Sequence, residues 1–288
     1  MPSDSPPIDA PAPAAASPRP LYYRHTLPVR LMHWINVVAL TVLFMSGLQI
    51  FNAYPVLHFG KSSYDGTPHA LEIGARMGPD GQPRGVTRVY GREFDTTGWL
   101  GAVKDANGEW IASTFPPWIM LPSAQWLAMA RLWHFFFAWV FVLNGLAFVL
   151  YAVASRHLTR DLAPTGTELR GIGASIRDHL RFRHPTGDAA KRYNVLQKLA
   201  YLAVIFVLLP FAVIMGFGLS PWLNSVLTGW VDLVGGRQSA RAFHFIIAWL
   251  LVMFVLIHVF QVIVTGLWNN LRSMITGRYR LPAEASHD

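Results

Sequence analysis

The chain contains no cysteine, and only 14% of its 288 residues are charged. Without cysteine, a protein can form no disulfide, no thiolate-bound iron–sulfur cluster, no Cys-x-x-Cys-His cofactor attachment and no cysteine nucleophile. Charged residues make up about 25% of an ordinary soluble domain. Together with a hydrophobic fraction of 52%, this scarcity of charge indicates an integral membrane protein.

The formal net charge of +8 does not by itself indicate a nucleic-acid partner. No nucleic-acid recognition motif accompanies it, and the basic residues cluster beside hydrophobic segments, where they orient a membrane protein. Residues 1–20 are rich in proline, alanine and serine and lack the basic-then-apolar order of a secretory signal peptide. We expect them to form a disordered tail.

Four stretches contain no Asp, Glu, Lys or Arg over the ~20 residues that a helix needs to cross a bilayer. Because backbone groups in lipid must be hydrogen-bonded internally, these stretches are expected to be helices rather than strands. They run over Leu31–Phe51, Leu132–Ser155, Leu199–Leu219 and Ala242–Trp268. The sequence therefore predicts an all-α integral membrane fold, a four-transmembrane-helix bundle within residues 21–275.

Basic residues are concentrated in three of the segments that flank these spans. They lie in the N-terminal flank, in the link over residues 156–194 and in the C-terminal flank, whose tail covers residues 276–288. The positive-inside rule places all three segments, and both termini, in the cytoplasm. The long loop over residues 52–130 and the short link over residues 220–241 then lie outside.

The outer loop is long for a connection and carries the signals of a β-hairpin. Asn107-Gly108, a dipeptide typical of tight hairpin turns, has apolar residues on both sides. Trp99, Trp110 and Trp118 lie in the same loop. Two interpretations remain open, a small cap resting on the membrane interface or a docking platform for a soluble partner, because exposed aromatic loops suit both roles.

Histidine occurs within the predicted spans at His33, His134, His244 and His258. The first span starts inside, whereas the second and fourth start outside. His33 and His258 therefore share the inner level, and His134 and His244 share the outer level. His258 follows His244 by fourteen residues, which is ~21 Å along a helix and ~40° short of four full turns. One face of the fourth helix thus carries one histidine of each pair.

An ionisable group inside hydrocarbon costs free energy unless it is paired or ligated. Histidine is a common haem ligand, so the depth-matched pairs predict two non-covalent b haems, each with two histidines on its iron. The alternative, four interfacial or hydrogen-bonded imidazoles, does not explain the pairing. No His-Glu-x-x-His zinc motif is present. The other histidines lie in flanks or loops and are expected to be solvated: His25, His58, His69, His157, His179, His184 and His287.

Two glycines are further candidates for the haem sites. Gly47 lies at the level of the outer pair and Gly145 near the inner pair, and a missing side chain lets a flat macrocycle approach a helix. The alternative is ordinary small-residue packing between membrane helices.

Several polar residues near the predicted ligands are candidates for contacts with cofactor or substrate. Arg30, Arg131, Lys198 and Arg241 are candidates to pair with haem propionates, or else to anchor the helices at the interface. Asn36 and Gln261 each lie three positions from an inner ligand. Either is a candidate hydrogen-bond donor to a quinone carbonyl, with a helix–helix or haem-edge contact as the alternative.

Several short motifs resemble those of the bacterial di-haem cytochrome b-561 superfamily, which includes the membrane subunits of nickel–iron hydrogenase, formate dehydrogenase and thiosulfate reductase. The motifs are Arg30–Trp34, Met45–Gly47, Leu132–His134, Arg241–His244 and Leu256–His258. The long outer loop, including Gly91–Gly98, looks most like the thiosulfate-reductase-type branch. Members of that branch are often associated with periplasmic molybdenum oxidoreductases.

The resemblance implies a cytochrome of the bacterial inner membrane that transfers electrons between the quinone pool and a periplasmic, molybdopterin-dependent oxidoreductase subunit. It also implies that the quinone reacts near the inner haem. One alternative is a stand-alone membrane oxidoreductase that acts on a small molecule such as superoxide. Another is a proton-coupled transporter, for which broken helices or paired repeats are expected.

Overall fold

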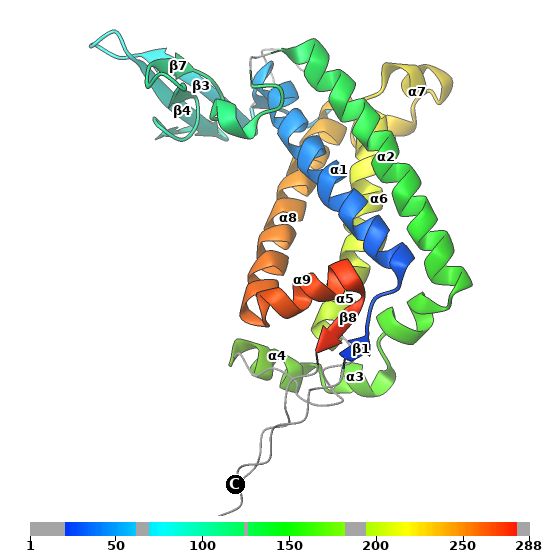
Figure 1. The fold of residues 1–288 in the computed structure, drawn as a ribbon. Helices are drawn as coiled ribbons and strands as arrows, with labels where there is room; N and C mark the ends of the chain where they lie inside the picture. The colour runs from blue at the N-terminus through cyan, green and yellow to red at the C-terminus, as the bar shows by residue number, and fades with distance from the viewer. Residues whose placement is uncertain (1–20, 62–68, 124–125, 182–193, 281–288) are drawn as a thin grey trace, which may run out of the picture.

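The computed structural model describes residues 21–61, 69–123, 126–181 and 194–280, so the predicted tail over residues 1–20 lies outside the described residues. Four helical segments are long and apolar enough to cross a membrane. They are α1 (Leu27–Asn52), α2 (Leu127–Ala154), α5 to α6 (Val195–Gly218) and α8 (Arg237–Val264). The predicted four-helix membrane bundle is confirmed (Figure 1).

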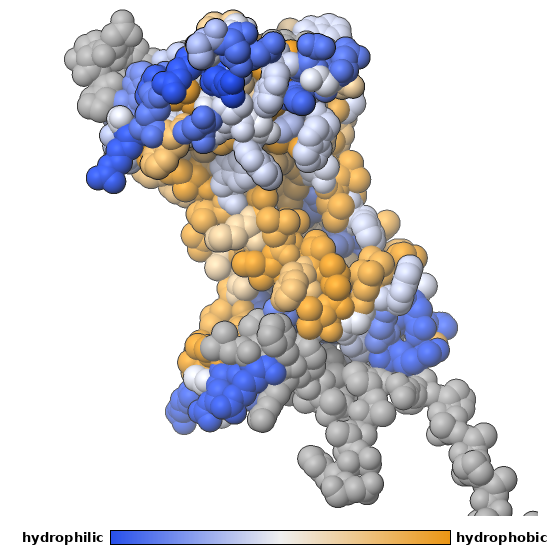
Figure 2. Space-filling view, turned by 90° about the vertical axis from the view of Figure 1, so that its left-hand side faces the viewer, coloured by the Kyte–Doolittle hydropathy of each residue, from blue (hydrophilic) through white to orange (hydrophobic). Residues whose placement is uncertain are grey.

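Within the bundle, α1 packs along α2, and α6 packs along α8. Hydrophobic residues form a band around the middle of the molecule, with hydrophilic residues at both ends (Figure 2). Large apolar side chains such as Leu143 and Leu150 are exposed within this band. In a membrane protein, lipid covers such exposed apolar side chains. With four helices long enough to cross the bilayer, the chain is a multi-pass membrane protein.

The two ends of the bundle differ in structure (Figure 1). We call the end that carries the short helices η2 (Leu158–Leu162), α3 (Gly166–Arg170) and α4 (Ile172–Leu180) the inner end. At this end β1 (Leu21–Tyr23) pairs antiparallel with β8 (Arg278–Arg280). The opposite, outer end carries the remaining strands, with η1 (Pro117–Ile119), α7 (Pro221–Val226) and η5 (Trp230–Val234).

The third span is built from α5 (Val195–Ala203), a π-helical turn η4 (Val204–Leu208) and α6 (Leu209–Gly218). Pro210 lies in the first turn of α6. Because proline cannot donate a backbone hydrogen bond and clashes with the preceding turn, the wider π-turn accommodates it without ending the helix.

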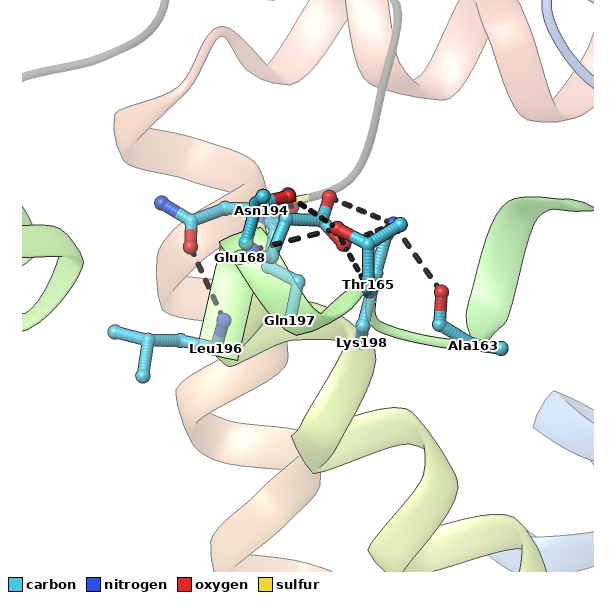
Figure 3. Close-up of polar contacts among 8 residues, drawn as sticks. Ala163, Thr165, Glu168, Asn194, Leu196, Gln197 and Lys198 are labelled. Atoms are coloured by element: carbon cyan, nitrogen blue, oxygen red, sulfur yellow. Dashed lines mark hydrogen bonds and ion pairs between the residues drawn. The ribbon is translucent and has the colours of Figure 1, made fainter. Parts of the chain in front are cut away.

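Polar contacts anchor the inner end of the third span (Figure 3). Asn194 caps α5 and forms a reciprocal capping box with Gln197. The buried Lys198 donates to both carboxylate oxygens of Glu168, at 2.8 and 3.0 Å. Glu168 itself belongs to the capping box of α3. The ion pair therefore joins α3 to the start of the third span.

The fourth span ends at Val264, so the predicted end at Trp268 is wrong. At Gly266 the backbone adopts a φ of +107°, which favours glycine, and the chain turns into α9 (Leu267–Thr276). Trp268 belongs to this second helix, which lies across the inner end of the bundle (Figure 1). The apolar composition continues through the break, which is why composition alone did not locate it.

The outer loop is a β structure. The antiparallel sheet consists of β2 (Val56–Leu57), β3 (Leu71–Met77), β4 (Pro83–Val89) and β5 (Arg92–Asp95), in that order. The predicted hairpin is confirmed as β6 (Ala102–Lys104) and β7 (Trp110–Ala112), with Lys104 opposite Trp110. The four-stranded sheet was not predicted, although Leu71–Met77 begins with apolar and polar residues in alternation.

Glycines let the hairpin lie directly against the sheet. A Cβ atom at Gly85 would lie 2.0 Å from the Leu100 carbonyl oxygen, and one at Gly101 would lie 2.0 Å from the Gly74 carbonyl oxygen. Neither position can accept a side chain without moving the backbone. We call strands β2 to β7 together with η1, within residues 56–61 and 69–120, the β segment. The β segment is therefore a compact unit held by backbone contact.

An apolar cluster joins the β segment to the outer end of α1. Its buried members are Leu48, Phe51, Leu57, Ile73, Phe115 and Met120. In contrast, Trp99 and Trp118 are 81% and 78% exposed. The segment is thus fixed to the bundle on one side and presents aromatic side chains on another, which fits both interpretations of the loop.

Candidate functional site

The four histidines of the spans form two close pairs. The ring centroids of His33 and His258 are 6.3 Å apart, and those of His134 and His244 are 6.2 Å apart. A metal–imidazole bond is ~2 Å long and a ring nitrogen lies ~1.1 Å from its centroid, so imidazoles on opposite sides of one metal ion have centroids ~6.2 Å apart. Both pairs therefore have the separation expected for two imidazoles that would bind one metal ion.

Hydrogen bonds orient both rings of the outer pair. The Ser46 hydroxyl donates to the Val42 carbonyl at 2.6 Å, so its oxygen accepts from His134 Nδ1, 3.1 Å away. His244 Nδ1 donates to the Ala212 carbonyl at 2.9 Å. With the proton of each ring on Nδ1, the lone pair lies on Nε2, which leaves that nitrogen to bind a metal.

Glycines make room for the same two rings. A Cβ atom at Gly47 would lie 3.4 Å from His134 Cε1, and one at Gly216 would lie 3.3 Å from His244 Cε1. His134 of α2 thus rests against α1, and His244 of α8 rests against α6. A Cβ atom at Gly145, in contrast, would have no protein atom within 4 Å, which leaves open space there.

Aromatic rings surround the inner pair. The ring of Phe254 stacks on that of His258 with an interplanar angle of 19°, and Tyr201 meets it edge-on at 6.5 Å. Trp34 packs edge-on against His33 with centroids 5.6 Å apart. Packing against rigid rings limits the rotation of both imidazoles.

The remaining predicted site residues have protein partners. Arg30 donates to the Ile275 carbonyl of α9, and Arg241 donates to the Tyr54 and Val56 carbonyls. Asn36 accepts a 2.7 Å hydrogen bond from Asn144 of α2, which is the helix–helix contact considered as the alternative.

The other three basic or polar candidates have different surroundings. The Arg131 guanidinium lies 5.8 Å from the ring centroid of Phe135. Lys198 is paired with Glu168. Gln261 lies on α8 three residues after His258. The roles of all these residues toward a cofactor or quinone stay predictions.

Sequence reasoning missed three positions that hold the outer rings: Ser46, Ala212 and Gly216. Two of them had a detectable signal: Ser46 lies within the Met45–Gly47 motif, and Gly216 lies near the outer end of the third span, at the depth of His244. The acceptor roles of Ser46 and the Ala212 carbonyl depend on how neighbouring helices are rotated, which no local pattern specifies.

The expectation that His58 is solvated, like the other histidines outside the spans, is wrong. Its side chain is 2% exposed and lies between Tyr54, at 3.2 Å from Nε2, and the ring of His69. Burial, with nearby His69 and Arg241, lowers the pKa of His58 below its usual value. The reason is tertiary, because the β segment folds over this position.

The donor set defines the kind of metal centre that the pairs can form. Among the residues that the structure describes, no three His, Cys, Asp or Glu side chains come together to hold a metal ion by themselves. Each imidazole pair would supply two ligands to a metal ion. A metal bound there would take its remaining ligands from outside the protein, as haem iron takes four from its porphyrin, and the residues present fit that group.

Comparison with known proteins agrees with this chemistry. The family described as prokaryotic cytochrome b561 matches residues 98–277. A protein of Azospira oryzae, named as a protein-methionine-sulfoxide reductase subunit, is 28% identical over 257 residues, 89% of this chain and 98% of that protein. A protein of Cupriavidus necator, named as a Ni/Fe-hydrogenase B-type cytochrome subunit, is 22% identical over 88% of this chain and 85% of that protein.

No solved structure matches the chain at a significant level. The family match covers 180 of the 288 residues, from 98 to 277, and includes α2, α5, α6 and α8. It is therefore broad enough to identify the family. The chain is a membrane b-type cytochrome and belongs to the prokaryotic cytochrome b561 family.

Proposed function

We propose that this cytochrome transfers electrons across the bacterial inner membrane between the quinone pool and a periplasmic oxidoreductase subunit. The observation that carries the proposal is the pair of imidazole sites at opposite levels of one helix. His244 and His258 are fourteen residues apart on α8, or ~21 Å along the helix axis. Two redox centres at these levels connect the two sides of the hydrophobic band.

His33 and His258 would hold the inner haem, and His134 and His244 the outer haem. A b-type haem with two histidine ligands has no open coordination position, so it carries electrons rather than binding a substrate. The protein contributes the orientation of the ligands, through Ser46 and the Ala212 carbonyl at the outer site. All four rings are partly buried between the helices.

The β segment is our candidate surface for the soluble partner. It is a compact unit fixed to the bundle, and its exposed Trp99 and Trp118 are the kind of side chain that protein interfaces use. Both named relatives are called subunits of oxidoreductases, which supports a partner subunit for this chain. The resemblance to the thiosulfate-reductase-type branch further favours a molybdopterin-dependent partner.

Charge supports the orientation in which the β segment is periplasmic. Within the described residues, the segment from the end of α2 to the residue after α4 carries five arginines at the inner end: Arg156, Arg160, Arg170, Arg177 and Arg181. The positive-inside rule places that end in the cytoplasm, with both termini. The quinone then reacts near the inner haem, because the partner uses the outer one.

Purified protein tests the proposal directly. We expect two non-covalent low-spin haems per chain, both reduced by a quinol analogue, and copurification of a soluble redox subunit from the native membrane. One haem per chain, or none, would contradict the two-centre arrangement. Turnover of a small molecule such as superoxide by the isolated chain would instead favour the stand-alone alternative.

A further inference from the structure

A pocket of about 700 Å³ lies at the inner end, outside the haem sites. It is formed by the turn that follows α8, by α9 and by β8. The side chains that line it include Trp268, Leu271, Arg272, Ile275, Tyr279 and Arg280. The walls are thus mainly apolar, with two guanidinium groups among them.

The chain around this pocket is strongly basic. Residues 21–30 and 265–280, which meet in the β1–β8 pair, contain five arginines and no aspartate or glutamate. They are Arg24, Arg30, Arg272, Arg278 and Arg280. A local excess of positively charged residues attracts an anionic group.

Arg272 has an unsatisfied donor. Its Nη2 atom is buried, and no hydrogen-bond partner for it exists in the part of the chain that the structure describes. A buried guanidinium N–H without an acceptor costs free energy, so such a group is normally satisfied by a ligand or a solvent molecule. The donor belongs to a residue that also lines the pocket.

The pocket lies where the bundle meets the membrane surface. A turn of two residues separates the end of α8 from the start of α9, and α9 crosses the inner end (Figure 1). Trp268 is 82% exposed and Ile275 is 64% exposed on this helix. Trp is typical of the boundary between hydrocarbon and headgroups.

We propose that this pocket binds the headgroup of one anionic phospholipid, with its phosphate held by Arg272 and Arg280. Free phosphate shares the charge chemistry, but the apolar wall suits a ligand that carries acyl chains. The chains would run along Trp268 and Ile275. The site does not depend on the electron partner or on the quinone, so it is a binding function separate from the proposed one.

Native mass spectrometry of the full-length, detergent-purified protein tests the site with phosphatidylglycerol as the probe. The wild type is expected to retain one phosphatidylglycerol and to prefer it to phosphatidylcholine. Arg272→Gln should weaken retention at least about tenfold, since hydrogen bonds to charged groups contribute about that factor or more. Arg177→Gln is the matched control. It removes the same positive charge from an exposed position on α4, and Arg177 does not line the pocket.

Arg280→Gln keeps the test decisive if Arg272→Gln fails to fold, as judged by the haem spectrum and the melting temperature. Equal retention in wild type and the pocket variants would overturn the proposal, and so would equal retention of phosphatidylcholine. Displacement of the lipid by millimolar inorganic phosphate would show a phosphate site instead and would also overturn it.

Discussion

The two imidazole pairs reach nearly the same ring separation, 6.2 Å at the outer level and 6.3 Å at the inner level, with different supports. At the outer level, Ser46 and the Ala212 carbonyl take the Nδ1 protons, and Gly47 and Gly216 lie beneath the rings. At the inner level, aromatic rings pack around the imidazoles.

Hydrogen bonds and packing constrain a ligand differently. A hydrogen bond to Nδ1 fixes the tautomer and raises the basicity of the ligand, whereas packing limits only the position of the ring. The outer site is therefore expected to respond to single polar or glycine substitutions, and the inner site to changes in how its helices are placed.

The largest expected effect comes from removing one ligand of each pair. His33→Ala should remove the inner haem and abolish quinone-linked turnover, while dithionite still reduces the outer haem. His134→Ala should remove the outer haem and leave the inner haem reducible by quinol. Haem content and reduced-minus-oxidised spectra measure both. Quinone turnover that survives His33→Ala but not His134→Ala would place the quinone at the outer side.

A smaller loss is expected when a methyl group is placed beneath an outer ring. Gly216→Ala puts a Cβ atom 3.3 Å from His244 Cε1, so the ring must shift by a few tenths of an ångström. We expect partial loss of the outer haem, with the inner haem retained, measured as haem per chain.

Gly145→Ala is the control for this substitution, because its Cβ atom would meet no protein atom within 4 Å. It should leave the outer haem unchanged. Loss of the inner haem in this variant would support the prediction that the inner macrocycle lies beside Gly145. An outer haem that is equally occupied in Gly216→Ala and the wild type would contradict the packing argument.

Ser46→Ala should have a more moderate effect, because it removes one hydrogen-bond partner of His134 and leaves the backbone hydrogen bond of His134 with Leu43. Loss of a partner behind a metal-bound imidazole typically weakens metal binding ~10–100-fold. We expect faster loss of the outer haem and a shifted midpoint potential. Thr41→Ala is matched, since the Thr41 hydroxyl also donates to a carbonyl four residues earlier, at 2.7 Å. An identical midpoint potential of the outer haem in the two variants would contradict the role of Ser46 as a hydrogen-bond partner of His134.

The smallest effect is expected at the inner level and concerns stability. Lys198 lies three residues before Tyr201, whose ring packs against His258. The ion pair between Lys198 and Glu168 therefore helps to position the Tyr201 ring beside this ligand (Figure 3). Glu168→Gln should lower the free energy of unfolding by about 1–3 kcal/mol at neutral pH, less than for a fully buried pair because Glu168 is partly exposed.

The pH dependence of that effect has a definite sign. Hydrogen bonds from Lys198 and the Thr165 backbone lower the pKa of Glu168 below its usual value. The stabilisation is therefore present above the unfolded-state pKa of ~4.3 and is lost as the pH falls through the lowered folded-state value. Melting temperatures of the wild type and Glu168→Gln should converge in acid. Asp161→Asn, which alters an exposed pair with His157, is the control and should change little.

Features with a regular repeat along the chain were predictable from the sequence. Helix rise and twist are nearly constant, so the fourteen-residue spacing of His244 and His258 specified one face and two depths before any helix was placed. The absence of charge over ~20 residues located the bounds of all four spans to within about five residues of α1, α2, the third span and α8. The Asn107-Gly108 turn predicted the hairpin for a similar local reason.

By itself, the sequence determined the membrane class, the number of spans and the four histidines that meet in pairs, because these depend on hydropathy and helical repeat. Only the tertiary structure decided that Ser46 and Ala212 orient the outer rings, that Gly216 makes room for His244 and that His58 is buried. These contacts join segments far apart in the chain. They depend on the rotation and crossing of whole helices, which are set by packing over many residues and leave no local pattern.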